Sequence, residues 1–154
     1  MVYAIALDDP RRDDVVALLE VHLAFAHRSS PARHVHALDV DRLCVPTITF
    51  VSARGEGAEL LGVGALRRID PAHGELKSMH TAERARRLGV GRAIAEHLVA
   101  LARDDGMTRV SLETGAQDAF APARALYASL GFTSCEPFAE YTTNPYSVCM
   151  TRAL

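Results

Sequence analysis

The feature that most constrains the fold is the stretch from residue 75 to residue 103, where a strand gives way to a helix through a loop with two glycines. Glu75–Thr81 has the composition of a strand, and helical periodicity runs from Gly89 to about Arg103. A second strand-like run, Arg109–Thr114, follows this helix. Such a strand–helix–strand unit predicts a right-handed crossover between two parallel strands. The apolar positions of the helix recur at helical spacing: Val90, Ile94, Leu98 and Leu101.

The loop itself reads Arg86-Arg87-Leu88-Gly89-Val90-Gly91-Arg92, and its residue types suit an anion. The first backbone N–H groups of a helix have no intrahelical partner, and the helix dipole places partial positive charge there. Glycine lets a ligand oxygen approach the main chain, and arginine adds a planar, permanently charged donor. The same residues also suit an ordinary solvated helix start, so the loop by itself leaves both interpretations open.

The rest of the chain alternates between short strands and helices. A helix with one apolar stripe is predicted after Asp8-Asp9-Pro10, and a second helix at about Pro122–Leu130. The turn Arg54-Gly55-Glu56-Gly57 joins two of the strands into an antiparallel hairpin. The pattern predicts a mixed α/β (α+β) domain with helices packed on a mostly antiparallel sheet. The further strands are expected at Val2–Leu7, Thr47–Ala53, Leu60–Ile69, Phe132–Phe138 and Ser147–Thr151.

Length and composition narrow the classes of protein. The 154 residues are expected to form a single domain, 1–154, and the hydrophobic fraction of 49% is that of a globular protein. A formal net charge of −2 gives no basic field for nucleic acid or an anionic membrane surface. The three cysteines have no CxxC spacing, which argues against a disulfide framework or a zinc site and fits a reducing cytoplasm. The N-terminus has no signal peptide or membrane span, so a cytoplasmic protein is predicted.

Two motifs resemble the GNAT superfamily of N-acetyltransferases. Arg86-x-x-Gly89-x-Gly91 is similar to the acetyl-CoA pyrophosphate loop of that family, and Leu126-Tyr127-x-x-x-Gly131-Phe132 to its second signature. Three further segments resemble a bacterial branch whose substrates are mostly unassigned: Glu75–Met79, Leu112–Gly115 and Asn144–Ser147. The resemblance implies the GNAT fold over nearly the whole chain, with a central sheet of about seven strands flanked by about four helices.

The chain departs from the family pattern at two positions. Arg87 stands where many members have glycine, and it would either stiffen the loop or add a phosphate contact. Phe120 stands where many members carry an asparagine that binds the pantetheine arm, so that contact is in doubt.

The resemblance also implies acetyl-CoA as co-substrate, with no metal. In the family, the strand before the loop pairs with the pantetheine amides, and the loop N–H groups hold the pyrophosphate. Carried onto this chain, the cofactor-binding residues are Met79, His80, Thr81, Arg86, Arg87, Leu88, Gly89, Val90, Gly91 and Arg92.

Two residues are the expected catalytic groups. Tyr127 would be the general acid, because a phenol stays protonated at neutral pH and can donate to the leaving thiolate; the alternative is a core tyrosine. Glu75 aligns with the family's strand glutamate and would be the general base, with Glu113 and His80 as further candidates; its alternative is an ion pair with Lys77 or an arginine. Strand alternation places Glu75, Lys77 and Met79 on one face, unless a bulge reverses part of it.

The leading functional prediction is therefore an acetyl-CoA-dependent N-acetyltransferase in which a primary amine of a small molecule or exposed peptide attacks directly in a ternary complex. A non-catalytic acyl-CoA-binding or sensing domain is the alternative. A nucleotide-binding P-loop is poorer, because the loop lacks Gly-Lys-Ser/Thr. The predicted partner is the amine, with a homodimer left open; His36 and Asp39 are further candidate substrate contacts, and the His34-Val35-His36 spacing lacks a third metal ligand.

Overall fold

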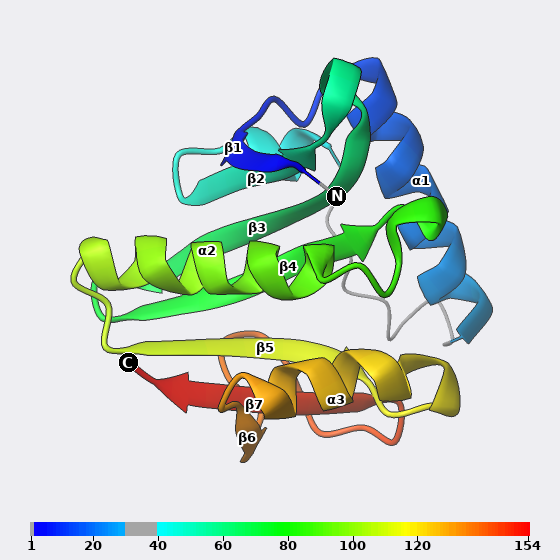
Figure 1. Cartoon of the computed structure of the whole chain (residues 1–154). Coiled ribbons are helices and arrows are strands. Elements are labelled where there is room, and N and C mark those ends of the chain that lie inside the picture. The colour runs from blue at the N-terminus through cyan, green and yellow to red at the C-terminus, as the bar shows by residue number, and fades with distance from the viewer. Residues whose placement is uncertain (1, 30–39) are drawn as a thin grey trace.

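The computed structural model describes residues 2–29 and 40–154, and the seven strands within these ranges form one continuous sheet (Figure 1). Their order across the sheet is β1-β2-β3-β4-β5-β7-β6. All neighbouring pairs are antiparallel except β4 and β5, which are parallel. The expected mixed, mostly antiparallel sheet is confirmed. The strands are β1 (Ala4–Leu7), β2 (Ile48–Arg54), β3 (Leu60–Asp70), β4 (His73–Thr81), β5 (Arg109–Gly115), β6 (Thr133–Cys135) and β7 (Ser147–Ala153).

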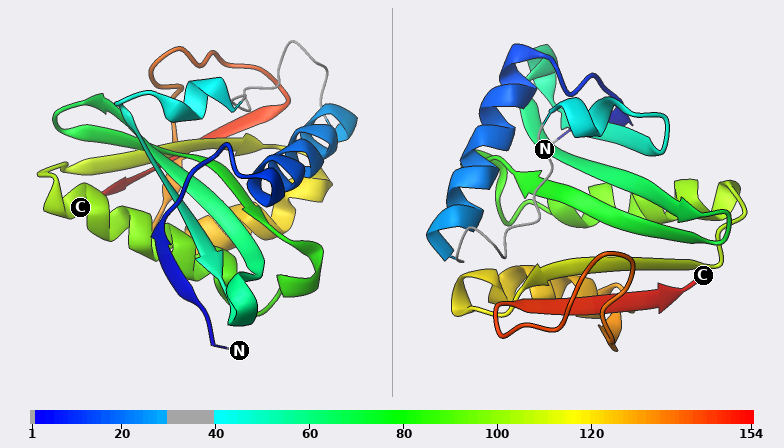
Figure 2. Two further views of the ribbon diagram at one scale, coloured as in Figure 1. Left: turned by 90° about the horizontal axis from the view of Figure 1, so that it is seen from above. Right: turned by 180° about the vertical axis from the view of Figure 1, so that it is seen from behind.

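Helices cover both faces of this sheet. Helix α1 (Asp13–Ser29) lies on one face, and α2 (Val90–Asp104) and α3 (Ala121–Ser129) lie on the other (Figure 2). The described residues thus hold three α-helices rather than about four, because the other helical segments, such as η2 (Asp41–Cys44), are short 3₁₀ turns. None of the helices in these ranges is long and apolar enough to cross a membrane.

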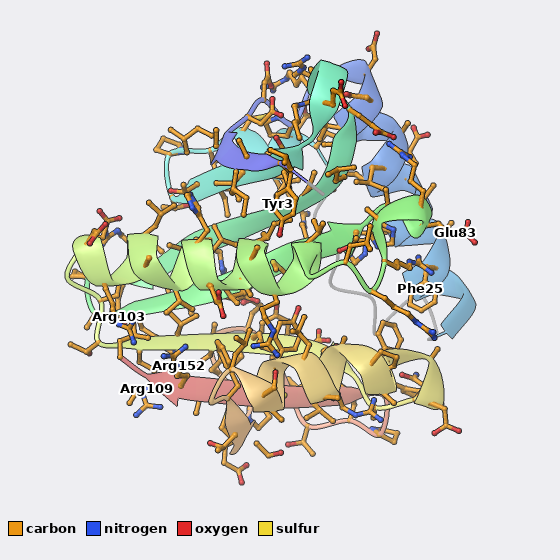
Figure 3. The ribbon with its side chains drawn as sticks, in the orientation of Figure 1. Tyr3, Phe25, Glu83, Arg103, Arg109 and Arg152 are labelled. Atoms are coloured by element: carbon orange, nitrogen blue, oxygen red, sulfur yellow. The ribbon has the colours of Figure 1, made fainter. Side chains whose placement is uncertain are left out.

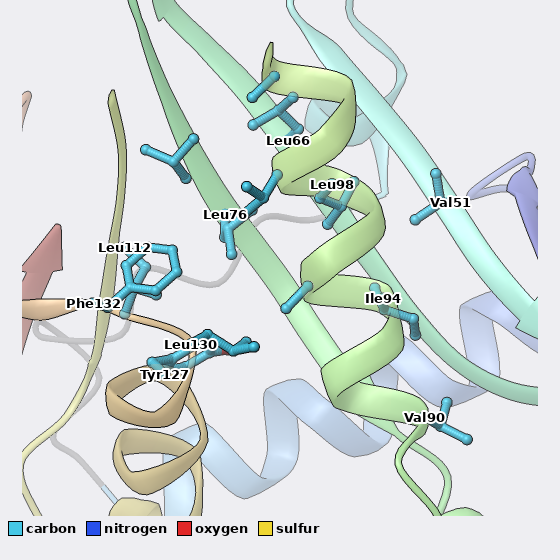
Figure 4. Packing of buried hydrophobic residues seen from close by; sticks show 14 of the residues in the cluster. Val51, Leu66, Leu76, Val90, Ile94, Leu98, Leu112, Tyr127, Leu130 and Phe132 are labelled. Carbon is cyan, nitrogen blue, oxygen red and sulfur yellow. The ribbon is translucent and has the colours of Figure 1, made fainter. Parts of the chain in front are cut away.

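The apolar stripes of the helices account for two clusters of buried side chains. Val15 and Leu19 of α1 pack with Val63 of β3 on the first face. On the second face, Ile94 and Leu98 of α2 pack against side chains of the strands that this helix covers (Figure 4). These are the positions that the 3.6-residue period predicts, and they hold β4 between the two helices.

One strand is much shorter than expected. A strand was expected at Phe132–Phe138, but β6 spans only Thr133–Cys135. Pro137 has no backbone N–H to donate to a ladder, which explains why pairing stops before it. The chain between β6 and β7 consequently becomes a loop, and this loop carries Tyr141 to the site described next.

Candidate active site

A cleft opens where the two parallel strands at the centre of the sheet separate. Strands β4 and β5 pair only from His73 with Arg109 to Leu76 with Leu112. Beyond that point β4 continues to Thr81 and β5 to Gly115. The resulting cleft has a volume of about 710 Å³ and is lined by both strands, the glycine loop, and parts of α1 and α3. Ligand sites commonly occur at such a break in a sheet.

A bulge in β4 decides which side chains face which helix. Val63 pairs with His80 and Ala65 with Lys77, so Ser78 and Met79 both lie opposite Gly64. Ser78 adopts a φ of 53°, in the left-handed region. The extra residue reverses the alternation beyond it. Met79 therefore packs toward α2 together with Leu76, while Lys77 and His80 face α1.

This arrangement corrects the alternation expected without a bulge, in which Met79 shared a face with Glu75. The bulge also leaves the hydroxyl of Ser78, which is 9% exposed, without a hydrogen-bond partner in the part of the chain that the structure describes. An orphaned buried hydroxyl in the wall of a cleft fits a ligand that supplies the missing hydrogen bond.

The glycine loop ends at the bare N-terminus of α2. Gly89, with a φ of 82°, is the N-cap, and no side chain caps the helix. The first intrahelical bond runs from the Ala93 amide to the Gly89 carbonyl (3.0 Å), so the amides before Ala93 are available to a ligand. A Cβ added at Gly91 would meet only ordinary contacts, the nearest being 3.4 Å away at Thr81. Internal packing thus does not require a glycine at position 91.

The arginines of the loop are not equivalent. The guanidinium of Arg92 donates to the Ser129 hydroxyl of α3 and lies 3.8 Å from Glu96. Neither Arg86 nor Arg87 forms an ion pair with any acidic side chain in residues 2–29 or 40–154, and both line the cleft. Arg87 has a φ of 64°, a conformation in which a residue with a Cβ is strained. Glycine, which is common at this position in the family that the loop resembles, would suit this backbone, and the arginine is the exception.

Tyr127 of α3 contributes a phenol to the opposite wall. The residue is 6% exposed, and its ring packs edge-on against Phe132 with centroids 6.0 Å apart (Figure 4). Burial raises the pKa of this phenol well above its usual value. The hydroxyl is therefore fully protonated at neutral pH and able to donate.

Glu75, the first-choice base, is held in a buried ion cluster. It is 1% exposed, and Arg67 Nε donates to its Oε1 at 2.7 Å. Its Oε2 accepts from Lys77 Nζ at 3.1 Å and from the hydroxyl of Tyr141. The ion pairs that were the alternative interpretation of Glu75 are thus present. Its role as the base stays a prediction, and the carboxylate already accepts three hydrogen bonds.

Glu113 of β5 also lines the cleft, and its surroundings differ from those of Glu75. Burial raises its pKa to about 7, with nearby Glu75 adding to the rise and Lys77 opposing it. A carboxylate with a pKa near neutrality can both take and release a proton, which a general base must do. The two candidate glutamates therefore divide into one that is fully paired and one that is poised to titrate.

His80 lies on the α1 side of the cleft against His22. Their Nδ1 atoms are 3.3 Å apart, and the ring centroids are 5.0 Å apart. Burial, together with the nearby His22 and Arg86, lowers the pKa of His80 to about 4, so the ring is neutral at pH 7. Its Nε2 is buried and has no partner among the described residues.

The cleft brings together Tyr127, Glu75, Glu113, the strand Met79–Thr81 and every residue of the loop Arg86–Arg92 except Leu88. The side chain of Leu88, which the sequence placed among the cofactor-binding residues, is exposed and does not line the cleft. Sequence reasoning missed His22, Phe25 and Tyr141, which come from a helix face and a loop whose patterns carry no chemical signature. His34, His36 and Asp39 lie outside the described residues. Within those residues, no group of His, Cys, Asp or Glu is arranged to hold a metal ion.

The chain is similar in sequence and in structure to known acetyltransferases. The sequence profile of the acetyltransferase (GNAT) family matches residues 13–132. An uncharacterised N-acetyltransferase of Bacillus subtilis, YsnE, is 46% identical over 150 residues, covering 97% of this chain and 99% of the relative. A Klebsiella pneumoniae structure provisionally named an acyl-CoA N-acyltransferase superposes with a TM-score of 0.81 at 26% identity, covering 99% and 97% of the two chains. A GNAT acetyltransferase of Elizabethkingia anophelis with acetyl-CoA bound has a TM-score of 0.72 at 16% identity, covering 99% and 98%.

Proposed function

This chain belongs to the GNAT family of acetyltransferases and is an acetyl-CoA-dependent enzyme, and from that premise we propose that it acetylates a primary amine of a small molecule or an exposed peptide. The amine attacks acetyl-CoA directly while both are bound. The observation that carries this proposal is the cleft between β4 and β5, which holds an open helix N-terminus, a protonated phenol and a titrating carboxylate in one space.

The loop and the strand before it would hold acetyl-CoA, which supplies the acetyl group as a thioester. The free amides at the start of α2 and the unpaired Arg86 suit the pyrophosphate. The part of β4 beyond Leu76 has no partner in β5, so its edge can pair with the pantetheine amides. Phe120 takes the place of the family's asparagine, so the side chain at this position cannot donate a hydrogen bond to the pantetheine arm.

Two side chains of the cleft would move the protons. The bond between carbon and sulfur breaks as the amine nitrogen binds the acetyl carbon, and the leaving sulfur receives a proton from Tyr127. The amine loses one proton to a base, directly or through water. Glu113 is favoured for this step because its carboxylate titrates near pH 7, whereas Glu75 is tied to Arg67, Lys77 and Tyr141.

A free-CoA release assay over a panel of amines, with mass spectrometry of the product, tests the proposal. We expect CoA release to depend on an amine and the product to gain one acetyl group. The second candidate, an acyl-CoA sensor, predicts tight CoA binding with slow turnover that no amine accelerates. The proposal includes a cytoplasmic location, which the three free cysteines support, because free thiols are typical of a reducing compartment.

A further inference from the structure

Aromatic side chains gather in the cleft, and two of them meet on its α1 side. The chain has five Phe and four Tyr, and five of these nine line this one cleft. Phe25 of α1 and Phe120 of η5 (Asp118–Phe120) meet edge-on, with centroids 5.1 Å apart at 67°. Phe25 is labelled in Figure 3, on the stretch of α1 that approaches the beginning of α3. The pair therefore links α1 to the segment that follows β5, and both rings line the cleft.

The backbone of β5 leaves room for one of these rings. A Cβ added at Gly115 would lie 2.1 Å from Cδ2 of Phe120, closer than any real contact. Only glycine at position 115 allows the Phe120 ring to lie against the strand. The position of Phe120 thus depends on a glycine in the neighbouring strand, and the Phe25–Phe120 pair forms one wall of the cleft.

The same side of the cleft presents one unsatisfied polar atom. His22 contacts His80 through Nδ1 and fixes its ring, and the Nε2 of His80 is left buried and unpaired among the described residues. A buried polar atom without a partner loses the hydrogen bonds that it would make with water, which destabilises the empty site. A ligand that brings a hydrogen-bonding group beside the Phe25–Phe120 wall removes that destabilisation.

Formal charges on this side of the cleft are already compensated. Glu75 is paired with Arg67 and Lys77, and Arg67 also pairs with Glu140 at 2.8 Å. Arg86 lies at the loop, where the proposed function assigns it to the pyrophosphate. The other arginines that line the cleft, Arg87 and Arg92, belong to the same loop. Among the described residues, no unpaired cation therefore lines the cleft outside that loop, and Glu113 is the one lining carboxylate without an ion pair.

We propose that Phe25, Phe120 and His80 form the acceptor subsite, and that it takes a monoamine whose remaining part is uncharged and apolar, preferably a ring. The amine nitrogen lies at the His80 Nε2, and the apolar part packs on the Phe25–Phe120 wall. This inference rests on the proposed function and narrows its substrate class. It excludes polyamines and free amino acids as good acceptors, because both carry a second charged group.

Three probes that differ in charge test the subsite: 2-phenylethylamine, phenylalanine and 1,4-diaminobutane. At saturating acetyl-CoA we expect kcat/KM for 2-phenylethylamine to exceed that for either of the others at least tenfold, measured by CoA release. Equal values, or a preference for phenylalanine or the diamine, overturn the inference. Calorimetry with CoA separates failure of the proposed function from failure of the subsite. A protein that binds no CoA refutes the proposed function. A protein that binds CoA but acetylates only phenylalanine or 1,4-diaminobutane, the probes with a second charged group, refutes the subsite alone.

Matched variants assign the contacts. Phe25→Leu and Phe120→Leu should each lower kcat/KM for 2-phenylethylamine by roughly threefold to tenfold, since an aromatic pair contributes about 0.5–1.5 kcal/mol. The KM for acetyl-CoA should stay within about twofold in both variants. Phe50→Leu makes the same change in the core outside this cleft and should leave kcat/KM unchanged. A rise in the acetyl-CoA KM with an unchanged amine KM would show instead that Phe120 lies along the cofactor.

Two amide substitutions at His80 distinguish contact with the amine from a purely structural role. Gln places a polar atom near the position of Nε2, whereas Asn keeps one near Nδ1, where His22 lies. We expect His80→Asn to raise the amine KM severalfold and His80→Gln to restore most of the affinity. The opposite order would mean that the contact with His22 matters and that the Nε2 does not touch the amine.

Discussion

At the scale of single residues, Tyr127 and Glu113 have environments that suit the two proton transfers proposed for them. The Tyr127 hydroxyl has no hydrogen-bond partner among the described side chains, and burial holds its pKa well above the usual value. We expect Tyr127→Phe to lower kcat about a hundredfold, because general acid catalysis contributes a factor of that order. Steady-state kinetics should give a nearly unchanged acetyl-CoA KM, and an unaltered kcat would remove the role of the phenol.

The pH dependence follows from the pKa of Glu113, which burial raises to about 7. A base acts in its deprotonated form, so kcat/KM should rise with pH through about 7 and then level off. Glu113→Gln should abolish this limb of the profile, and Glu75→Gln should retain it. If the limb disappears in Glu75→Gln and survives in Glu113→Gln, Glu75 is the base after all.

At the scale of the secondary-structure elements, the loop before α2 combines a strained residue with an open helix end. Arg87 has a φ of 64°, which costs a residue with a Cβ about 1–2 kcal/mol. Arg87→Gly should therefore be more stable than Arg87→Ala by about 1 kcal/mol in urea unfolding, the reverse of the order inside a helix. An Ala variant as stable as the Gly variant would show that the loop relaxes out of this conformation.

Gly91 lies in the first turn of α2, where the free amides point out of the helix. Gly91→Asp places a carboxylate beside the expected pyrophosphate, so it should abolish CoA binding in calorimetry. Gly91→Ala is the control, because its Cβ would meet nothing closer than 3.4 Å and the variant should fold and bind. Undiminished binding by the Asp variant would contradict the assignment of this loop.

At the scale of the whole molecule, the buried cluster around Glu75 links parts of the chain that are distant in sequence. Arg67 belongs to β3, Lys77 to β4, and Tyr141 to the loop between β6 and β7. The cluster thus ties the C-terminal loop to the centre of the sheet, beside the cleft.

Glu75→Leu leaves Lys77, which is 8% exposed, without its counter-ion in the interior. Breaking a buried pair in this way costs about 3–5 kcal/mol, and we expect this loss in the free energy of unfolding measured with urea. Adding Lys77→Met to the same variant should recover part of the loss, since no unpaired charge then stays buried. A loss below about 1 kcal/mol would show that the cluster does not hold the loop.

The sequence by itself determined what depends on neighbours along the chain. The periodic apolar positions predicted α2, and the turn Arg54–Gly57 between two strand-like runs predicted the hairpin. The two motifs that contain Gly89, Gly91 and Tyr127 predicted the family, because such motifs are local. The tertiary structure alone decided the rest. The bulge at Ser78 turned Met79 toward α2, the splay of β4 from β5 opened the cleft, and the loop beyond Pro137 brought Tyr141 onto Glu75. Whether a glutamate is held in an ion pair or is free to titrate depends on groups from distant parts of the chain. A local sequence pattern cannot show that folding brings these groups close to it.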